Sequence, residues 1–349
     1  MAVASIGEFE LIDRLIQRLR QTRSDGLLIG IGDDAAAWKP SSGCLTVATT
    51  DSLVEGVHFD LATTSWRDLG WKALAENVSD IAAMGCEPRY ALIALALRGA
   101  SSLVDVEELY EGIGACAEAY HFAVVGGDVV QSTQLAINVT LLGESMAVQP
   151  GSTDRPLLER SMARVGDVIA VTGPLGGSAA GLRLLLEGRA DDDAAHRDVL
   201  EAHRRPKARV VAGRTLVEAG IRCGIDVSDG LVADVGHLCE RSGCDAEIDA
   251  DHVPVHPGAR AAFGDEAIDL ALSGGEDYEL VCAGSADALA RAGKLLRQRG
   301  EPPLTLIGSM VTPIDAGGKV RVRSFGGALM NLDREGYQHF DENREPEGG

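Results

Sequence analysis

The chain has 349 residues, of which 45% are hydrophobic and 24% are charged, and its formal net charge is −21. This length and composition are typical of a globular protein with two domains. Acidic residues outnumber basic ones by 53 to 32 and no basic cluster is present, so we expect no nucleic-acid partner. The longest apolar run, residues 90–97, is far too short for a membrane span, and the acidic N-terminus does not fit a signal peptide. We therefore expect a cytoplasmic protein without a membrane partner.

Cysteine usage supports the same compartment. The seven cysteines form no CxxC pair, and most lie inside apolar stretches, which is typical of small core residues in a reducing environment. Cys239 and Cys244 are an alternative pair of metal ligands, although no further His or Cys pair completes the set.

Hydrophobic periodicity predicts an α/β unit in the first half of the chain. Strands are expected at residues 44–51, 89–97, 122–128 and 135–144, and helices at residues 8–20, 66–84 and 105–120. Residues 145–166 break this pattern with Gln149-Pro150-Gly151 and Arg155-Pro156, which indicates a connection between domains. We place the domains at residues 1–150 and 151–349.

The second half of the chain, after the connection, is also predicted to alternate strands and helices. Strands are expected at residues 167–173, 224–228, 246–250, 278–283 and 304–308, and helices at 181–188, 207–219 and 230–242. The charged, aperiodic insert at residues 189–198 is expected to be a solvated loop. The turn GPLGGSAAG, residues 173–181, is interpreted as a tight strand-to-helix connection, with a backbone phosphate cradle as the alternative.

Aspartates recur at predicted strand ends and on one apolar helix. They occur in GIGDDAAA (30–37), TTDSL (49–53), ENVSD (76–80), GGDVV (126–130) and DVSDG (226–230). Burying carboxylates without partners is costly, and too few cations flank these segments to pair them all. Hard divalent cations suit this ligand set, because Mg²⁺ prefers carboxylate, hydroxyl and water oxygens and shares them with phosphates. The sequence therefore predicts a multi-metal phosphate site.

Each aspartate taken alone is also explained as a turn former or a helix N-cap. Asp33 and Asp34 are adjacent, so we expect one to face the site and the other to cap the turn. Thr49 and Thr50 are expected to offer hydroxyl or carbonyl oxygens beside Asp51.

The helix-borne motif has its own expected arrangement. Asn77 and Asp80 lie three residues apart and are expected to line a cleft together, whereas Glu76 is expected to pair with Lys72 at i−4. Asp234, one turn after DVSDG, is expected to be a surface or helix-pairing group.

The motifs that are missing narrow the chemistry. The chain has no GxxxxGK[ST] sequence, no GxGxxG after a strand, no GxSxG elbow and no His next to a Cys. A covalent intermediate is therefore not indicated. What remains is transfer governed by positioning and charge neutralisation, which is typical of phosphoryl transfer.

Several motifs together carry a resemblance to a known family. These are GEFELIDRL, GIGDDAA, TTDSLVEGVHF, KALAENVSDIAAMGCEP, GGD, DVSDGL, SGGEDYEL and GYQHF, which span residues 7–340 in this order. The set resembles thiamine-monophosphate kinase, a member of the superfamily that contains aminoimidazole ribonucleotide synthetase, selenophosphate synthetase and a hydrogenase maturation factor. TTDxLVxGxHF combined with SGGEDYE separates the kinase from these relatives.

The resemblance implies a two-domain α/β (α+β) fold like that of aminoimidazole ribonucleotide synthetase, with a homodimer formed by strand pairing between N-terminal domains. It also implies transfer of the γ-phosphoryl group of ATP to thiamine monophosphate, giving thiamine diphosphate. The implied Mg²⁺ ligands are Asp34, Thr49, Thr50, Asp51, Asp80, Asp128, Asp226 and Asp229. The implied ATP contacts are Tyr110, Gly127, Arg160 and Ser228, and the implied substrate contacts are His58 and Glu276.

Three of these implied contacts have simpler explanations. His58 is alternatively a structural histidine, Glu276 a plain turn carboxylate, and Arg160 a surface arginine. No residue is assigned as a general base, because the acceptor phosphate oxygen is already anionic near neutral pH.

The chain departs from the family pattern at two places. Arg334 stands where the family often carries an aromatic residue before the final Gly-Tyr, and its charge would repel a thiazolium cation; Tyr337 is a candidate substitute for stacking. After GGD the family often continues with Thr and a nearby Arg, whereas Val129, Val130 and Gln131 stand here. Phosphate binding is therefore expected to depend more on metal.

Two other functions remain open from the sequence. One is a superfamily relative that uses ATP to activate a different small acceptor, such as a ribonucleotide amidine. The other is a nucleotide-binding protein without catalysis, which would bind ATP and Mg²⁺ but release no ADP.

Overall fold

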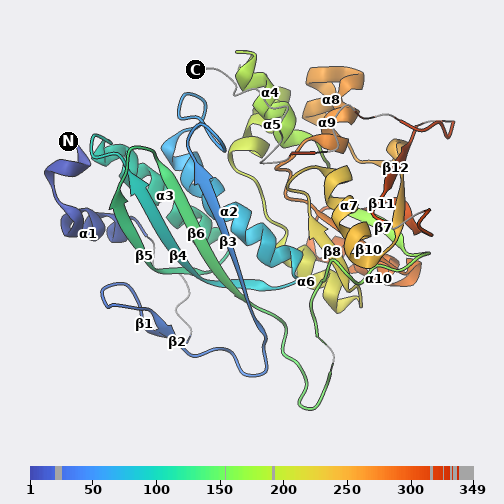
Figure 1. Ribbon diagram of the computed structural model, residues 1–349, viewed down its shortest axis with the longest axis horizontal. Helices are drawn as coiled ribbons and strands as arrows, with labels where there is room; N and C mark the ends of the chain where they lie inside the picture. The colour runs from blue at the N-terminus through green and yellow to red at the C-terminus, as the bar shows by residue number, and fades with distance from the viewer. Residues whose placement is uncertain are drawn as a thin grey trace.

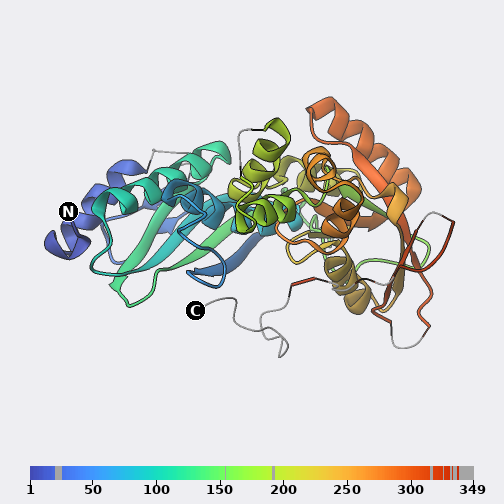
Figure 2. The same ribbon diagram turned by 90° about the horizontal axis from the view of Figure 1, so that it is seen from above.

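Two β-sheets lie side by side along the long axis of the molecule, in a computed structural model of the chain (Figure 1). The structure describes residues 1–19, 26–153, 155–190, 193–314, 317–324, 326–330, 332, 336 and 337. In the view from above, the N-terminal and C-terminal units occupy opposite ends of the molecule (Figure 2). The predicted α/β fold class is thereby confirmed.

The N-terminal sheet has the strand order β3-β6-β4-β5. Its strands are β3 (Thr46–Val54), β4 (Glu87–Leu97), β5 (Ala123–Gln131) and β6 (Ala136–Glu144). Helices α2 (Trp66–Ala83) and α3 (Leu103–Ala119) cover one face. Alternate residues of β6, such as Ile137 and Val139, are buried beneath them, as expected for a half-covered strand. A short hairpin, β1 (Leu27–Ile29) and β2 (Ala37–Trp38), packs Trp38 against Tyr90 with ring centroids 5.1 Å apart.

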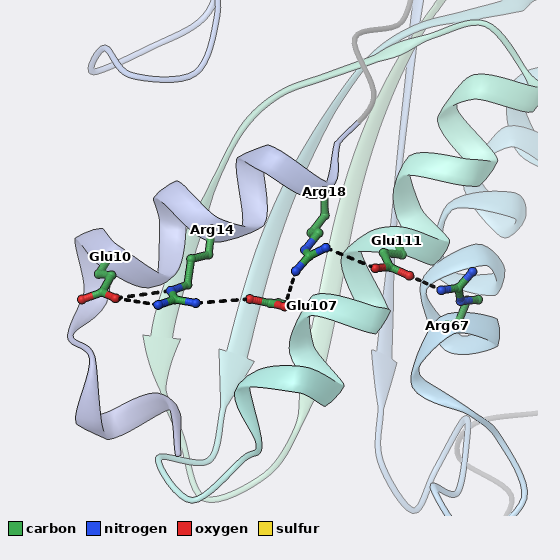
Figure 3. Close-up of polar contacts among 6 residues, drawn as sticks. All are labelled: Glu10, Arg14, Arg18, Arg67, Glu107 and Glu111. Carbon is green, nitrogen blue, oxygen red and sulfur yellow. Dashed lines mark hydrogen bonds and ion pairs between the residues drawn. The ribbon is translucent and has the colours of Figure 1, made fainter. Parts of the chain in front are cut away.

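The first helix, α1 (Glu8–Arg18), packs along α3 after the 3₁₀ turn Val3–Ser5. Leu11 and Leu15 on its inner face are buried in the N-terminal core. A ladder of ion pairs runs along the exposed seam and ends on α2 (Figure 3). In order, it joins Glu10, Arg14, Glu107, Arg18, Glu111 and Arg67.

The C-terminal sheet has the order β12-β9-β11-β7-β10-β8. Its strands are β7 (Val168–Thr172), β8 (Cys223–Asp226), β9 (Asp245–Asp249), β10 (Leu280–Gly284), β11 (Leu304–Val311) and β12 (Val320–Arg323). Its helices are α4 (Gly177–Leu186), α5 (Ala194–Arg204), α6 (Val210–Glu218), α7 (Leu231–Ser242), α8 (Pro257–Phe263), α9 (Ala267–Ser273) and α10 (Ala286–Arg299), with 3₁₀ turns at Ala250–His252 and Gly264–Glu266. Among the described residues, no helix is long and apolar enough to cross a membrane.

Helix α2 connects the two units. One of its faces packs on β3 and β6, and another packs on α6 and on β8, the edge strand of the C-terminal sheet (Figure 1). The α2–α6 crossing is close because Gly213 has no side chain: a Cβ there would lie 2.0 Å from the carbonyl oxygen of Ala82. The same helix therefore touches the cores of both units.

The insert at residues 189–198 was expected to be a solvated loop, and this expectation is wrong for its second half. Helix α5 begins at Ala194, with the Asp193 side chain accepting a hydrogen bond from the backbone N–H of Ala195 at 2.9 Å. The helix is stabilised by burial of Val199 and Leu200, which follow the charged residues in the sequence. The polar residues at the start of α5 gave no helical hydrophobic periodicity, so its first turns were not predicted.

Candidate active site

Carboxylates from one strand of each sheet lie near a carboxylate of α2. Asp51 of β3 is hydrogen-bonded to Asp80 of α2, and the Thr49 hydroxyl donates to Asp80 Oδ2. Asp226, at the end of β8, accepts a 2.6 Å hydrogen bond from the Ser79 hydroxyl and lies within electrostatic range of Asp80. Ser79 and Asp80 are consecutive residues, so α2 brings the carboxylates of the N-terminal and C-terminal units together.

The electrostatics of these carboxylates favour the binding of a cation. Burial, reinforced by Asp80, raises the pKa of Asp51 to about 6 and that of Asp226 to about 7. Burial also raises the pKa of Asp80. The guanidinium of Arg160 opposes the shift at both Asp80 and Asp226, but one cation does not balance three carboxylates. A group of carboxylate oxygens with two neighbouring hydroxyls, those of Thr49 and Ser79, fits a hard divalent cation such as Mg²⁺.

The DVSDG and SGGEDYE motifs form one unit of two packed turns. The backbone N–H of Glu276 donates to the carbonyl of Ser228 at 2.8 Å, and that of Tyr278 donates to the carbonyl of Val227 at 2.9 Å. The glycines permit this contact, because a Cβ on Gly275 would lie 2.5 Å from the Ser228 carbonyl oxygen. Ser228, which follows the Asp226 strand, and Glu276, which precedes β10, are therefore fixed beside each other.

Asp234 is not the surface group that was expected. Its side chain is 1% exposed, and Oδ2 accepts hydrogen bonds from the backbone N–H groups of Ser228, Asp229 and Gly230 at 3.0–3.2 Å. The carboxylate therefore satisfies the N–H groups that precede α7. Because its partners lie four to six residues earlier, helix periodicity gave no signal for this role.

The Gly-rich turn before α4 has an equivalent internal acceptor. Asp277 accepts from the backbone N–H of Gly176 at 2.6 Å and from that of Ser178 at 3.1 Å. These N–H groups are therefore already bonded, which supports the tight-connection interpretation over a phosphate cradle.

Lys72 does not form the ion pair that was expected. Its Nζ lies 2.7 Å from Glu276 Oε1, and His203 Nδ1 lies 3.3 Å from Glu276 Oε2. Glu76 instead packs near Tyr278, with Oε1 buried and without a hydrogen-bond partner, and burial raises the pKa of Glu76 to about 8. Burial favours the uncharged form of Glu76, whereas the more exposed Glu276 retains its charge beside Lys72.

The sheet register separates a second group of predicted residues from the carboxylates. β3 and β5 are opposite edges of the four-stranded sheet, about 14 Å apart at three strand spacings. Asp51 is in line with Gly127, and Asp128 is one residue further along, so the Asp51 and Asp128 side chains point to opposite faces. The side chain of Thr50 also points away from Asp51, and its hydroxyl donates to the Val139 carbonyl at 2.9 Å.

The remaining predicted residues lie in separate environments. Asp34 is exposed between β1 and β2, and its backbone N–H is bonded by Asp33, which is the expected capping partner. His58 Nδ1 accepts from the backbone N–H of Val54 at 3.0 Å. Tyr110 lies in the N-terminal core. Arg334 lies outside the described residues.

Asn77, which was expected to line a cleft with Asp80, is fully buried. Its amide nitrogen donates to the Ala73 carbonyl at 3.1 Å, while its Oδ1 has no hydrogen-bond partner. Tyr337, the candidate stacking residue, has its backbone N–H bonded to the Asp229 carbonyl at 3.1 Å. Gly336 and Tyr337 therefore lie beside the DVSDG turn.

The cysteines behave as core residues. All seven are free thiols, and six of them are buried. Burial raises the pKa of Cys239 to about 12, which disfavours the thiolate that a metal needs. Within the described part of the chain, the one group of three His, Cys, Asp or Glu side chains whose ligand atoms all lie within 4.8 Å of one another is Asp229, Asp234 and His237, and it contains no cysteine. Asp51, Asp80 and Asp226, taken as a group of three, do not meet this distance.

A cavity of about 270 Å³ lies next to these turns, between α5 and the residues that follow it. Its two arginines are already paired, Arg205 with Asp68 and Arg209 with Glu279, at 2.5 Å each. The lining also includes Lys207 and His256, together with Asp198, Glu201 and Asp277.

The comparisons with known proteins agree with this architecture. Residues 32–145 match the family described as AIR synthase related protein, N-terminal domain, and residues 164–318 match AIR synthase related protein, C-terminal domain. The chain is 37% identical over 348 residues to thiamine-monophosphate kinase of Escherichia coli K12, covering 96% of this chain and 98% of that one. It is 33% identical over 344 residues to the Bacillus subtilis enzyme, covering 95% and 99%.

Solved structures give the same result. The crystal structure of thiamine-monophosphate kinase from Stenotrophomonas maltophilia K279a has a TM-score of 0.78 at 38% identity, covering 92% of this chain and 98% of that chain. AaThiL complexed with AMPPCP and TMP has a TM-score of 0.73 at 32% identity, covering 97% and 99%. Fold and sequence together define a two-domain protein of the AIR synthase related class. Within this class, the chain belongs to the thiamine-monophosphate kinase family.

Proposed function

We propose that this protein transfers the γ-phosphoryl group of ATP to the phosphate of thiamine monophosphate, forming thiamine diphosphate and ADP in thiamine diphosphate biosynthesis. The supporting observation is the convergence of Asp51 of β3, Asp80 of α2 and Asp226 of β8 in a chain of the thiamine-monophosphate kinase family. A relative of similar fold has been solved with AMPPCP and TMP, which are an ATP analogue and the expected acceptor.

These three carboxylates are the proposed holders of Mg²⁺. Two phosphate groups 4 Å apart would repel each other by about 4 kcal/mol per pair of unit charges at an effective dielectric of 20. Bound Mg²⁺ ions would supply the positive charge that offsets this repulsion and the orientation that in-line transfer requires. Arg160, which already lowers the pKa of Asp80 and Asp226, would add positive charge at the same place. The acceptor phosphate oxygen is itself anionic, so no side chain needs to remove a proton.

The other predicted contacts are distributed around this centre. The two hydrogen-bonded turns beside Asp226 carry Ser228, Asp229 and Glu276. We assign Ser228 to ATP, Asp229 to metal and Glu276 to the organic part of the acceptor. Thr49 would orient Asp80 through its hydroxyl. His58 is assigned to the acceptor. Arg334 remains a prediction outside the described residues.

A homodimer would bring the second group of residues to the site. Asp128 and Gly127 lie on β5, at the sheet edge opposite to β3, which carries Asp51, and the side chains of Asp128 and Thr50 point to the uncovered face. One chain alone therefore does not unite the side chains of Asp128 and Asp51. Pairing with a second copy would supply Asp128 from the other chain, whereas Tyr110 would stay in the N-terminal core of each copy. Sedimentation of the purified protein tests this assembly. We assign the protein to the cytoplasm, in keeping with its free thiols.

The activity is tested with purified protein, ATP, Mg²⁺ and thiamine monophosphate. The expected result is stoichiometric formation of thiamine diphosphate and ADP, lost on chelation of Mg²⁺. ADP release that requires a different phosphorylated acceptor would instead identify a superfamily relative. ATP binding without ADP release for any acceptor would identify a protein without catalysis.

A further inference from the structure

Glu276 is the accessible member of a mostly buried polar cluster. Its side chain is 30% exposed, whereas Lys72 and His203, which contact its two carboxylate oxygens, are only 3% and 7% exposed. Lys72 belongs to α2 of the N-terminal unit and His203 to α5. Two separate elements therefore contact the Glu276 carboxylate through buried side chains. The Ser178 hydroxyl lies 3.0 Å from the same His203 nitrogen.

The backbone of Glu276 is also held in a fixed position. Its φ of 65° lies in the left-handed region, which is uncommon for a residue with a side chain. The N–H bond to the Ser228 carbonyl and the packing of Gly275 stabilise this conformation. Strained backbone of this kind persists where surrounding contacts determine it, and it is concentrated at ligand sites.

The charges around Glu276 keep it ionised. Burial alone would raise its pKa, but Lys72 and then His203 hold the pKa of Glu276 well below its usual value. Burial and the neighbouring Lys72 lower the pKa of His203, which favours the neutral imidazole. The other ionisable groups facing Glu276 are Glu76 and Tyr278. The result is a charged, rigid hydrogen-bond acceptor that is open to solvent on one side.

The position of this acceptor relative to the metal ligands follows from α2. Lys72 and Asp80 are eight residues apart, which corresponds to about 12 Å along the helix. An acceptor with a phosphate near Asp80 would therefore place its other end near Glu276. In thiamine monophosphate, that end is an aminopyrimidine whose amino group is a hydrogen-bond donor.

We infer that Lys72 is a positioning residue for acceptor specificity: with His203, it fixes Glu276 to accept a hydrogen bond from the amino group of the acceptor. This inference rests on the proposed function and assigns a role to a residue that touches neither phosphate nor metal. In this role Lys72 acts only through Glu276. A merely structural ion pair would instead stabilise the contact between the two units without affecting acceptor binding.

The test is a double-mutant cycle on the full-length protein. Lys72→Met and Glu276→Gln are each expected to raise KM for thiamine monophosphate about tenfold or more, with kcat within about threefold and KM for ATP unchanged. The double variant is expected to be no worse than Glu276→Gln within about twofold, because the lysine has no effect without the carboxylate. The inference would be overturned if the increase in KM of the double variant equalled the product of the two single increases. It would also be overturned if the single variants lost only kcat.

Arg205→Met is the matched control. It breaks another ion pair between α2 and the C-terminal unit, from Arg205 Nε to Asp68 Oδ1 at 2.5 Å, without touching Glu276. Its effect is expected to be small and to add to that of Glu276→Gln. The same non-additivity for Arg205→Met would mean that general loosening of the interface, rather than positioning, explains the cycle, and would overturn the inference.

A second measurement uses the unmodified enzyme and does not depend on the folding of a variant. Oxythiamine monophosphate carries oxygen in place of the amino group, so its KM is expected to be at least about tenfold higher than that of thiamine monophosphate. Equal KM values would overturn the inference. A wild-type protein that makes no thiamine diphosphate would contradict the proposed function itself, whereas an active wild type with an unaffected Lys72→Met variant contradicts only the role of Lys72.

Discussion

At the scale of single residues, the carboxylates of the site are stabilised by groups that lie next to them in space. Thr49 and Ser79 donate to Asp80 and Asp226, but neither hydroxyl carries the charge that the cluster lacks. The apo cluster is therefore most stable when it is protonated, and this has a consequence for its pH dependence.

Asp226 should make the metal-free protein less stable as the pH rises. Its pKa is about 7 in the folded state against 3.8 for an exposed aspartate, so its contribution is fully present below pH 3.8 and is lost as the pH approaches 7. In EDTA, the melting temperature of the wild type should fall relative to that of Asp226→Asn by at least about 4 °C between pH 5 and pH 7.5. Differential scanning fluorimetry measures this difference.

Added Mg²⁺ should reverse the loss. At pH 7.5 it should raise the melting temperature of the wild type and leave Asp226→Asn nearly unchanged. Asp105→Asn, at the start of α3, is the control and should behave as the wild type in both experiments. Parallel melting curves for the wild type and Asp226→Asn at every pH would contradict the account of this cluster.

Sequence reasoning predicted Asp51, Asp80 and Asp226 as metal ligands from carboxylates at expected strand ends and on an apolar helix. Asp226 does end β8, but Asp51 lies inside β3, because that strand continues to Val54. The same reasoning did not identify Ser79 or the partner of Lys72, because these contacts join residues 147 and 204 positions apart in the sequence. The i, i+4 rule favoured Glu76 as that partner, and the tertiary contact with Glu276 overrode it. Local spacing identifies candidate ligands, whereas their supporting contacts depend on the folded structure.

At the scale of elements, α2 carries the geometry of the site. Its residues Lys72, Glu76, Ser79 and Asp80 recur at helical spacing and form one polar stripe toward the C-terminal unit. The spacing between α2 and α6 therefore controls how closely Asp80 approaches Asp226.

Replacing Gly213 with alanine should separate α2 from α6. The new Cβ would lie 2.0 Å from the Ala82 carbonyl oxygen, so the helices must move apart, and both the melting temperature and kcat should fall. Gly293→Ala in α10 is the matched control, because its nearest neighbour is a side-chain atom at 3.8 Å. It should keep the wild-type activity and gain stability from helix propensity. Equal melting temperatures for the two variants would contradict the importance of the close crossing.

The ion-pair ladder between α1 and α3 should contribute little to stability and nothing to catalysis (Figure 3). Glu107 contacts both Arg14 and Arg18, and these arginines are about 40% exposed, so Glu107→Ala should cost about 0.5–1 kcal/mol at low salt and less at high salt. Urea unfolding measures the difference, with the exposed neighbour Glu108→Ala as the control. A loss of several kcal/mol, or a large fall in kcat, would show that the position of α1 matters to the site.

At the scale of the whole molecule, the periodicity of the sequence predicted most of the elements of both sheets. The α2 region was predicted at residues 66–84 and is found at Trp66–Ala83, because its apolar positions recur over many turns. Helices α8, α9 and α10 and strands β1, β2 and β12 were not predicted, and the first five residues of α5 were placed in a loop. Charged residues mask the short apolar patterns of α5, α10 and β12. The order in which the strands pair could not be predicted from the sequence, since it depends on contacts between distant segments.

The convergence of the two units on one cluster is the claim on which the proposed function depends. N-terminal Asp51 and Asp80 and C-terminal Asp226 contribute to it, whereas Asp128 lies across the sheet and needs another route. The metal affinity of the cluster should therefore depend on ligands from both units.

Isothermal titration of Mg²⁺ into the protein with AMPPCP tests this dependence most directly. The wild type should bind Mg²⁺, and Asp80→Asn and Asp226→Asn should each weaken that binding by about tenfold or more while the proteins remain folded. An unchanged affinity in Asp226→Asn would mean that the C-terminal unit supplies no metal ligand, which would contradict the shared site.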